Sequence, residues 1–347
     1  MAQNDVLVEV KGLKTHFFTD EGVVKAVDGV DLNIYKGKML CVVGESGCGK
    51  SITARSILQL IDKPGRIVEG DILYHKADGE ILNIAKLHPH SPEIRGIRGN
   101  DIAMIFQEPM SSLSPVYTIG NQITEGILLH QEVGKQEARE RAIECLRRVG
   151  IPKPEERMDA YPFQLSGGMR QRAMIAMALV CEPKLLIADE PTTALDVTTQ
   201  AQILDLILEL QEDMGMAVMF ITHDLGVVAE IAHDVSVMYL GNVVEFGDVD
   251  SIFHDPKHPY TQALLRSIPK MGLGEQVRLD TIQGMVPHPF ARPKGCPFHP
   301  RCEQKMVGVC DQYLPEREEP TPGRHVRCLL YSDLERLASE AEQGGVA

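Results

Sequence analysis

Two segments near the start of the chain alternate between apolar and polar residues, which is the pattern of half-buried β-strands. They run from Val6 to Phe18 and from Val23 to Tyr35. A continuous apolar run from Met39 to Val43 follows, and such runs are typical of strands buried on both faces of a parallel sheet. The sequence therefore predicts a small antiparallel sheet followed by the first strand of a parallel core.

The spacing of apolar residues changes to three and four between about residues 109 and 179. Short apolar runs return afterwards, and Lys184 to Glu190 and Ala217 to Ile221 predict two more buried parallel strands. An α/β domain with a helical subdomain inserted at about residues 109–179 accounts for this order. The predicted helical segments are Gly120 to Leu129, Gly134 to Val149 and Gly168 to Leu179.

Periodicity weakens after Pro256, where the composition shifts to proline, histidine and cysteine. Little regular pattern remains between residues 274 and 324. We therefore predict a main α/β domain over residues 1–265 and a loop-rich C-terminal extension over residues 266–347.

Composition and charge narrow the class of protein. The chain has 347 residues, of which 44% are apolar, enough for one large core and an appendage. Its formal charge of −14, from 35 Lys and Arg against 49 Asp and Glu, has the wrong sign for a surface that binds nucleic acid. The first residues show no secretory signal, and no stretch reaches the ~20 apolar residues of a membrane helix. We therefore expect a cytoplasmic protein that reaches a membrane only through protein partners.

A glycine-rich loop follows Val43 and fits G-x-x-x-x-G-K-[ST] at every fixed position. Its glycines allow backbone N–H groups to surround an anion, and the next helix points its positive end at the same place. Lys50 is placed to reach the β- and γ-phosphates, and Ser51 to ligate Mg²⁺. The pattern predicts a nucleotide site made by Gly44, Glu45, Ser46, Gly47, Cys48, Gly49, Lys50, Ser51 and Ile52.

Two carboxylates and a histidine stand at the ends of the later strands. Asp189 and Glu190 end the run that starts at Lys184, and His223 closely follows the run that ends at Ile221. Ligands of open parallel sheets gather at the carboxyl edge of the strands. We expect Asp189 to hold Mg²⁺, Glu190 to accept a proton from the attacking water, and His223 to sense the γ-phosphate.

The segment Leu165 to Arg172 resembles the signature motif of ABC-type ATPases. Ser166 is expected to cap a helix whose first turn exposes backbone N–H groups at Gly167 and Gly168, a second anion site without a lysine. The resemblance implies a P-loop NTPase fold and two subunits packed head to tail, with each ATP between one phosphate loop and the other chain's signature. Met169 stands where the broad family pattern has glutamine; we expect little loss of catalysis, because Ser166 and the backbone make the phosphate contacts.

Further roles follow from the same resemblance. Phe106 to Glu108 corresponds to the glutamine loop, and Asp196 lies in the dimer-contact loop. Phe17 corresponds to the aromatic platform for adenine, with Phe18 as the alternative. The implied catalytic residues are Glu190, His223, Gln107 and Lys50, and the implied Mg²⁺ ligands are Ser51, Gln107 and Asp189.

The resemblance covers the whole chain and is closest to the D-type ATPase subunits of oligopeptide and dipeptide importers. It implies an ATP-hydrolysing motor that works with two transmembrane permease subunits and, indirectly, an extracytoplasmic substrate-binding protein. A paralogous ATPase subunit is the expected dimer partner, and a homodimer is the alternative. The segments that carry this resemblance are Gly44 to Ser46, Met104 to Met110, Pro191 to Thr198 and His258 to Leu265.

Three alternatives concern function. Related importers carry nickel, glutathione or oligosaccharides, so the cargo stays open. A soluble ABC ATPase that acts on nucleic acid shares the phosphate chemistry, but the chain has no long heptad insert, tandem ATPase halves or basic arm. A binding or redox-sensing module is disfavoured because Glu190 and His223 are both present.

The C-terminal extension contains four of the eight cysteines, with 5, 7 and 17 residues between them. Cytosolic cysteines seldom form disulfides, and four in a loop-rich segment suggest a metal site. The extension resembles the cysteine pattern of peptide-importer ATPases that hold a [4Fe-4S] cluster. Zinc is the alternative, although no short C-x2-4-C pair is present, and unligated thiols are the third. The predicted ligands are Cys296, Cys302, Cys310 and Cys328.

Overall fold

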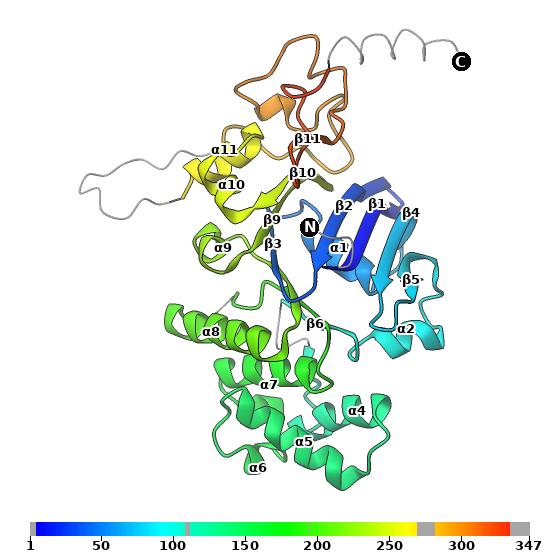
Figure 1. Ribbon diagram of the computed structural model, residues 1–347, viewed down its shortest axis with the longest axis vertical. Helices are drawn as coiled ribbons and strands as arrows, with labels where there is room; N and C mark the ends of the chain where they lie inside the picture. The colour runs from blue at the N-terminus through cyan, green and yellow to red at the C-terminus, as the bar shows by residue number, and fades with distance from the viewer. Residues whose placement is uncertain (1–4, 108–111, 194, 269–281, 334–347) are drawn as a thin grey trace, which may run out of the picture.

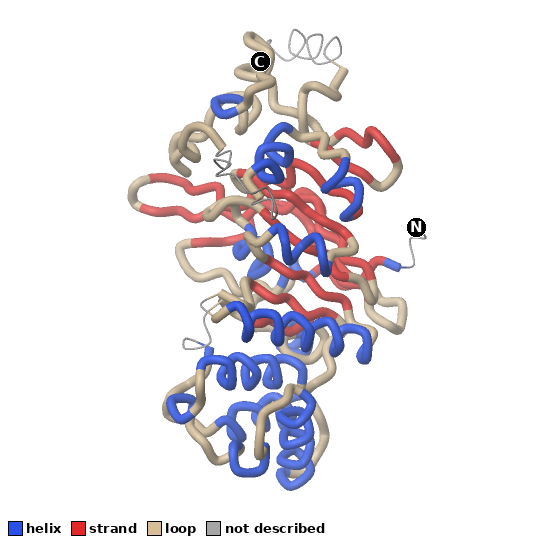
Figure 2. Tube along the Cα trace, turned by 90° about the vertical axis from the view of Figure 1, so that its left-hand side faces the viewer, coloured by secondary structure: helices blue, strands red, loops and turns tan. Residues whose placement is uncertain are grey.

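The computed structural model describes residues 5–107, 112–193, 195–268 and 282–333. These residues form an elongated molecule, with a helical lobe at one end, two sheets in the middle and the C-terminal extension at the other end (Figure 1). Seen from the side, the strands gather in the central region, and the described part of the helical lobe consists of helices and loops (Figure 2).

The first sheet is antiparallel and has the strand order β2-β1-β4-β5. The two predicted strands are confirmed to within one residue at each end. Val10 pairs with Leu32 and Leu13 pairs with Val30, and all four side chains are buried, which explains the alternating pattern. The other two strands of this sheet were not predicted from the sequence. The four strands are β1 (Val6–Thr19), β2 (Gly22–Tyr35), β4 (Gly65–His75) and β5 (Ile81–Asn83).

The second sheet has eight strands in the order β11-β12-β10-β9-β3-β8-β7-β6. The five strands from β9 to β6 are parallel, and β10, β12 and β11 add an antiparallel edge. Every residue of β3, β7 and β8 is buried, as the three continuous apolar runs predict. The strands are β3 (Met39–Val43), β6 (Ile102–Ile105), β7 (Leu185–Asp189), β8 (Ala217–Ile221), β9 (Asp234–Tyr239), β10 (Asn242–Asp248), β11 (Glu318–Thr321) and β12 (Arg324–Val326).

Strands β3, β7 and β8 are parallel neighbours and each leads into a helix, so their carboxyl ends meet at one edge of the sheet. Strand β3 lies between β8 and β9 and leads into the first of these helices, while β8 lies between β3 and β7. This strand order places the phosphate loop beside the two carboxylates at the end of β7. The helices around the sheet are α1 (Lys50–Ile57), α2 (Pro92–Ile97), α8 (Val197–Met214), α9 (Leu225–Ile231) and α10 (Val249–His254).

The helical lobe is confirmed, although residues 108–111, where it was expected to begin, lie outside the described part of the chain. The side chains of Thr118 and Ser166 cap its first and last helices by accepting hydrogen bonds from backbone N–H groups. The apolar faces of the helices, including Ile123, Leu146 and Ile175, are fully buried in one core with the parallel sheet. The helices are α4 (Ile119–His130), α5 (Lys135–Arg148), α6 (Pro154–Arg157) and α7 (Gly167–Leu179).

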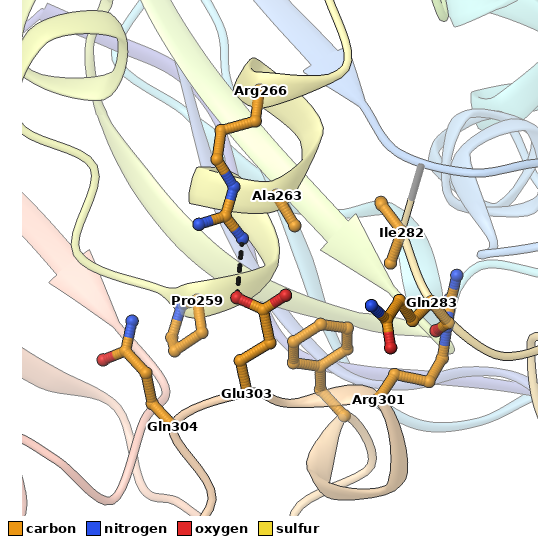
Figure 3. Close-up of a pocket in the computed structure, with 9 residues that line it drawn as sticks. Pro259, Ala263, Arg266, Ile282, Gln283, Arg301, Glu303 and Gln304 are labelled. Atoms are coloured by element: carbon orange, nitrogen blue, oxygen red, sulfur yellow. Dashed lines mark hydrogen bonds and ion pairs between the residues drawn. The ribbon is translucent and has the colours of Figure 1, made fainter. Parts of the chain in front are cut away.

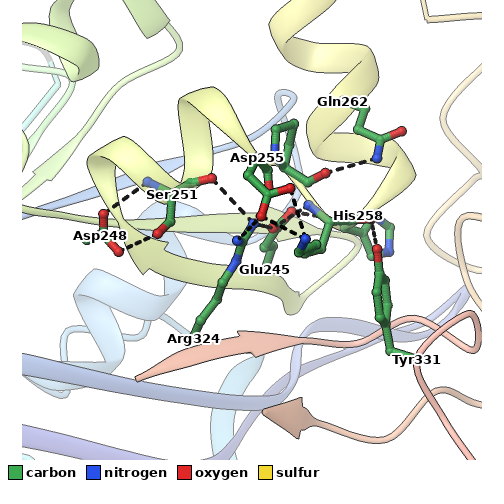
Figure 4. A network of polar contacts seen from close by, with 10 residues as sticks. Glu245, Asp248, Ser251, Asp255, His258, Gln262, Arg324 and Tyr331 are labelled. Atoms are coloured by element: carbon green, nitrogen blue, oxygen red, sulfur yellow. Dashed lines mark hydrogen bonds and ion pairs between the residues drawn. The ribbon is translucent and has the colours of Figure 1, made fainter. Parts of the chain in front are cut away.

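The C-terminal extension packs directly on the main domain. Strand β12 pairs with β10, and Phe298 and Leu329 belong to the same buried core as the parallel sheet. Figure 4 shows the polar contacts that join them: the fully buried carboxylate of Glu245 accepts hydrogen bonds at 2.7 to 3.0 Å from Arg324 Nη2 and from the backbone N–H groups of Lys257 and His258. The division at residue 265 stays a prediction, because the sheet and the core both continue across it. The helix α11 (Pro259–Arg266) lies at this division.

Candidate active site

The phosphate loop has a backbone that only glycine can adopt at its ends. Gly44 has φ 148° and Gly49 has φ 104°. A Cβ atom would lie 2.2 Å from the Met238 carbonyl oxygen at Gly44 and 2.4 Å from the Ala26 carbonyl oxygen at Gly49. The fixed glycines therefore allow the loop to pass close to neighbouring backbone between β3 and α1.

Lys50 closes the loop on itself. Its Nζ donates to the carbonyl oxygens of Gly44 at 2.7 Å and Glu45 at 3.3 Å, and the residue is only 6% exposed. Phosphate oxygens are stronger hydrogen-bond acceptors than these carbonyls. The ammonium group of Lys50 can therefore exchange these carbonyl contacts for hydrogen bonds to a bound nucleotide.

A cavity of about 250 Å³ opens over this loop. Gln107 and Glu190 also line it, so the structure brings the predicted phosphate loop, glutamine loop and catalytic base together. Ser51 Oγ donates to Asp189 Oδ1 at 2.9 Å, which places two of the three predicted Mg²⁺ ligands side by side. The remaining lining residues are Ala26, Ser46, Gly47, Cys48, Gly49, Lys50, Ser51 and Ile52.

Asp189 is suited to a cation. It is 2% exposed, and its burial raises the pKa of the carboxyl group, with a further rise from the neighbouring Glu190. A bound cation would reverse this shift, because it favours the ionised form. The donor set of carboxylate, hydroxyl and amide oxygen therefore fits Mg²⁺.

The Glu190 carboxylate is held from three directions. Its Oε2 accepts hydrogen bonds from Gln107 Nε2 and from Thr193 Oγ1, both at 3.0 Å, and lies 3.7 Å from His223 Nδ1. Glu190 is 17% exposed at its side chain, whereas His223 is 70% exposed and free to turn towards a ligand. The contact from Thr193 was not predicted from the sequence.

The signature segment lies away from this cavity. Ser166 caps α7 through Met169 N–H at 3.3 Å, and Ser166 and Gly167 are exposed. Neither these residues nor Gly168 line the cavity at the phosphate loop. Figure 1 places α7 in the helical lobe, below the sheet that carries α1. The predicted anion site at the start of α7 is therefore separate from the cavity at the phosphate loop.

Four other predicted residues lie outside the cavity lining. Asp196 caps α8, and hydrogen bonds from Thr199 lower the pKa of its carboxyl group. The ring of Phe17 is partly buried against Gly65, and Phe18 is exposed under the Arg66 guanidinium at 4.3 Å. The side chain of Glu45 does not line the cavity but binds Arg301 in the C-terminal extension.

The four cysteines of the extension are free thiols, close enough to interact electrostatically with one another. Burial raises the pKa of Cys296 to about 11 and of Cys328 to about 12, and the neighbouring thiols contribute to both shifts. In the described part of the chain, however, no three Cys, His, Asp or Glu side chains are arranged to hold a metal ion. Four thiolates suit an iron-sulfur cluster in number and chemistry, but their arrangement does not match a metal site.

Comparisons with known proteins agree with the motifs. The family model "ABC transporter" matches residues 27–193, and "Oligopeptide/dipeptide transporter, C-terminal region" matches residues 244–310. A probable peptide ABC transporter ATP-binding protein of Sinorhizobium fredii is 51% identical over 96% of this chain and 97% of its own length. The dipeptide transport ATP-binding protein DppD of Escherichia coli is 50% identical over 93% of this chain and 96% of its own.

Among solved structures, the post-hydrolysis dimer of the ATP-binding cassette MJ0796 with ADP and Pi is similar to this chain. It has a TM-score of 0.61 and 28% identity, over 70% of this chain and 99% of that one. No helix in the described residues is long and apolar enough to cross a membrane. The phosphate loop, the carboxylates beside it and these relatives lead to one conclusion: the chain belongs to the ABC transporter ATP-binding proteins of the oligopeptide and dipeptide branch, and it is an ATPase.

Proposed function

We propose that this chain is the motor subunit that hydrolyses ATP to drive the import of dipeptides or oligopeptides. The observation that carries the proposal is the single cavity in which the phosphate loop meets Gln107 and Glu190, with the Ser51 and Asp189 pair beside it. The peptide cargo rests on relatives of about 50% identity whose names specify peptide or dipeptide transport.

The proposed chemistry is in-line attack of water on the γ-phosphate. The backbone N–H groups of the loop and Lys50 bind the phosphates, and Glu190 accepts the proton of the attacking water. Gln107 and Thr193 hold that carboxylate in place through their hydrogen bonds at 3.0 Å. Ser51, Asp189 and Gln107 would hold Mg²⁺, which when bound would neutralise charge on the phosphate oxygens.

A second ATPase subunit completes the site in this proposal. The exposed first turn of α7 offers Ser166 and the backbone N–H groups after it to the nucleotide bound by the partner. The structure of MJ0796 is a dimer bound to ADP and Pi, which supports such an assembly. We propose a paralogous partner, with Asp196 and its neighbours at the contact.

The membrane partners are proposed to dock on the helical lobe, which places the chain at the cytoplasmic side of the membrane. Tyr117 and Phe163 are 58% and 64% exposed, and Tyr161 stacks on Phe163 with ring centroids 5.5 Å apart. The Ile119 N–H donates to the Ala160 carbonyl at 2.9 Å, so the two segments with these aromatic residues lie side by side. An exposed aromatic patch of this kind is suited to a protein partner.

The function can be tested in vesicles that contain the chain, its partner ATPase and the two permeases. With the substrate-binding protein present, a labelled dipeptide should accumulate only when ATP is supplied on the ATPase side. If nickel, glutathione or an oligosaccharide accumulated and the dipeptide did not, that solute would be assigned as the cargo. ATP hydrolysis stimulated by nucleic acid, with no solute uptake, would contradict the motor role.

We also propose that Cys296, Cys302, Cys310 and Cys328 hold a [4Fe-4S] cluster, with zinc as the alternative. The support is the proximity of four thiols, three of which are 8% exposed. Binding would require the thiols to move together and lose their protons, as metal sites that form on ligand binding do.

Protein purified without oxygen should then be brown, with about four irons and four acid-labile sulfides per chain. Cys302→Ser should bleach it, whereas Cys145→Ser, at a free thiol in the helical lobe, should keep the colour. Stoichiometric zinc without sulfide would replace the cluster by a zinc site. Metal-free protein with an ordered extension would exclude both.

A further inference from the structure

Arg301 joins the C-terminal extension to the phosphate loop. Its guanidinium forms a two-pronged ion pair with Glu45, with Nη1 2.6 Å from Oε2 and Nη2 2.9 Å from Oε1. The two residues are 256 positions apart in the sequence. Fork-to-fork pairs of this kind fix direction as well as distance, which a single lysine contact cannot do.

The arginine is built into its position. Its side chain is 4% exposed, Nε donates to the Gln283 carbonyl at 3.1 Å, and Nη1 approaches Tyr239 Oη at 3.4 Å. Figure 3 shows Arg301 beside Gln283 at one end of a cavity of about 300 Å³, whereas Arg266 pairs with Glu303 farther along it. The guanidinium therefore cannot turn away from Glu45 without leaving buried donors unpaired.

Tyr260 of α11, against which the extension packs, holds the loop backbone as well. Glu45 N–H donates to Tyr260 Oη at 2.9 Å, and Tyr260 packs with Tyr239 and Phe298, with ring centroids 4.7 to 5.3 Å apart. Both the main chain and the side chain of Glu45 are therefore fixed by residues outside the phosphate loop. The carbonyl oxygen of Glu45 accepts a hydrogen bond from Lys50 Nζ, so the position of Glu45 also affects the catalytic lysine.

Charge gives this contact a consequence for binding. Glu45 is the first residue after Gly44, so its carboxylate lies next to a loop that has to bind a triphosphate. An unpaired carboxylate there would repel the nucleotide, and the repulsion would be little screened at a largely buried site. Arg301 cancels this charge and keeps the carboxylate turned away from the cavity.

We propose that Arg301 is a positioning residue of the ATPase site, which sets the affinity for ATP by holding and neutralising Glu45. The inference rests on the proposed nucleotide site. It assigns the C-terminal extension a direct part in nucleotide binding, beyond that of a separate appendage. Any event that displaces residues 296–302 would reach the phosphate loop through this ion pair.

Arg301→Met should raise the KM for ATP about tenfold, the size expected for one lost charge-assisted contact, and leave kcat within about threefold. Arg301→Lys should give an intermediate KM because it keeps the charge and loses the fork. The measurements are steady-state hydrolysis and equilibrium ATP binding with the full-length chain.

A matched control separates this role from loosening of the extension. Arg327 also joins the extension to the main domain, through Asp31 on β2 at 2.8 Å. Arg327→Met should lower the melting temperature and leave the KM for ATP unchanged. An equal rise of KM in both variants, or a wild-type KM in Arg301→Met, would overturn the proposal.

A double variant tests whether the two residues act through each other. Glu45→Gln/Arg301→Met should have a KM no higher than that of Arg301→Met, because the charge that the arginine cancels is gone. If the rise in KM of the double variant equalled the product of the rises in the two single variants, the residues would act independently, and this result would also overturn the proposal. If the wild-type chain bound no ATP, the proposed nucleotide site itself would fail, which is a different result.

Discussion

Glu190→Gln is expected to lower ATP hydrolysis roughly 10²- to 10⁴-fold, the usual contribution of a general base, and to leave ATP binding intact. The amide has the same shape as the carboxylate and can keep the contacts with Gln107 and Thr193, but it cannot take a proton. ATP should then accumulate in a closed dimer. Phosphate release and light scattering of the protein with ATP and its partner subunit measure both effects.

A glutamate at the other end of the same strand provides the control. Glu182 precedes β7, is exposed and has a left-handed backbone with φ 54°, as Glu190 has with φ 46°. Glu182→Gln should hydrolyse ATP at the wild-type rate. Near-normal turnover in Glu190→Gln would refute its assignment as the base.

The trapped dimer also tests the signature. Ser166→Arg, added to Glu190→Gln, should abolish the ATP-dependent dimer while each chain still binds ATP. Thr118→Arg removes a comparable helix cap in the same lobe and should leave the dimer intact. If the Ser166→Arg chains still dimerised with ATP, the role of this segment towards the partner's nucleotide would be wrong.

Lys50→Ala is expected to weaken ATP binding by roughly 10- to 100-fold, because hydrogen bonds to charged groups contribute about 1.5 to 3 kcal/mol each. His223→Ala should leave the dissociation constant within about threefold and lower hydrolysis by about 10², the size found when one donor to developing charge is removed. The dissociation constants come from equilibrium dialysis with labelled ATP, and the rates from phosphate release. The two variants therefore separate binding from catalysis.

Lys135→Ala is the control for the first variant, since Lys135 is an exposed lysine at the start of α5. It should bind and hydrolyse ATP normally. Equal losses of ATP affinity in Lys50→Ala and His223→Ala would contradict the separate roles.

The elements predicted from the sequence are those whose pattern is local. Strands β3, β7 and β8 are buried on both faces, so each appears as a continuous apolar run. Each helix of the lobe packs one face against a core, so apolar residues recur along its sequence at spacings of three and four. The phosphate loop is contiguous because its work is done by successive backbone N–H groups and by glycines that admit a close approach.

The sequence pattern did not predict the strands that are stabilised mainly by pairing with a neighbouring strand. The strands β11 and β12 have four and three residues, too few for a period to be visible, and they form because β10 offers a free edge. The composition of the extension predicted loops for this reason. Its four cysteines lie close together in the sequence. Whether their thiols are arranged to bind a metal depends on how the chain folds around them.

By itself, the sequence determined the chemistry of this protein: a phosphate loop, two carboxylates at a strand end and a signature segment, each encoded in adjacent residues. Only the tertiary structure decided which of these groups meet. Ser51 reaches Asp189 across 138 residues, and Gln107 reaches Glu190 across 83, because parallel strands end at one edge. Arg301 reaches Glu45 because the extension packs over β9 and α11, and no periodicity of a single chain encodes such a contact between distant segments.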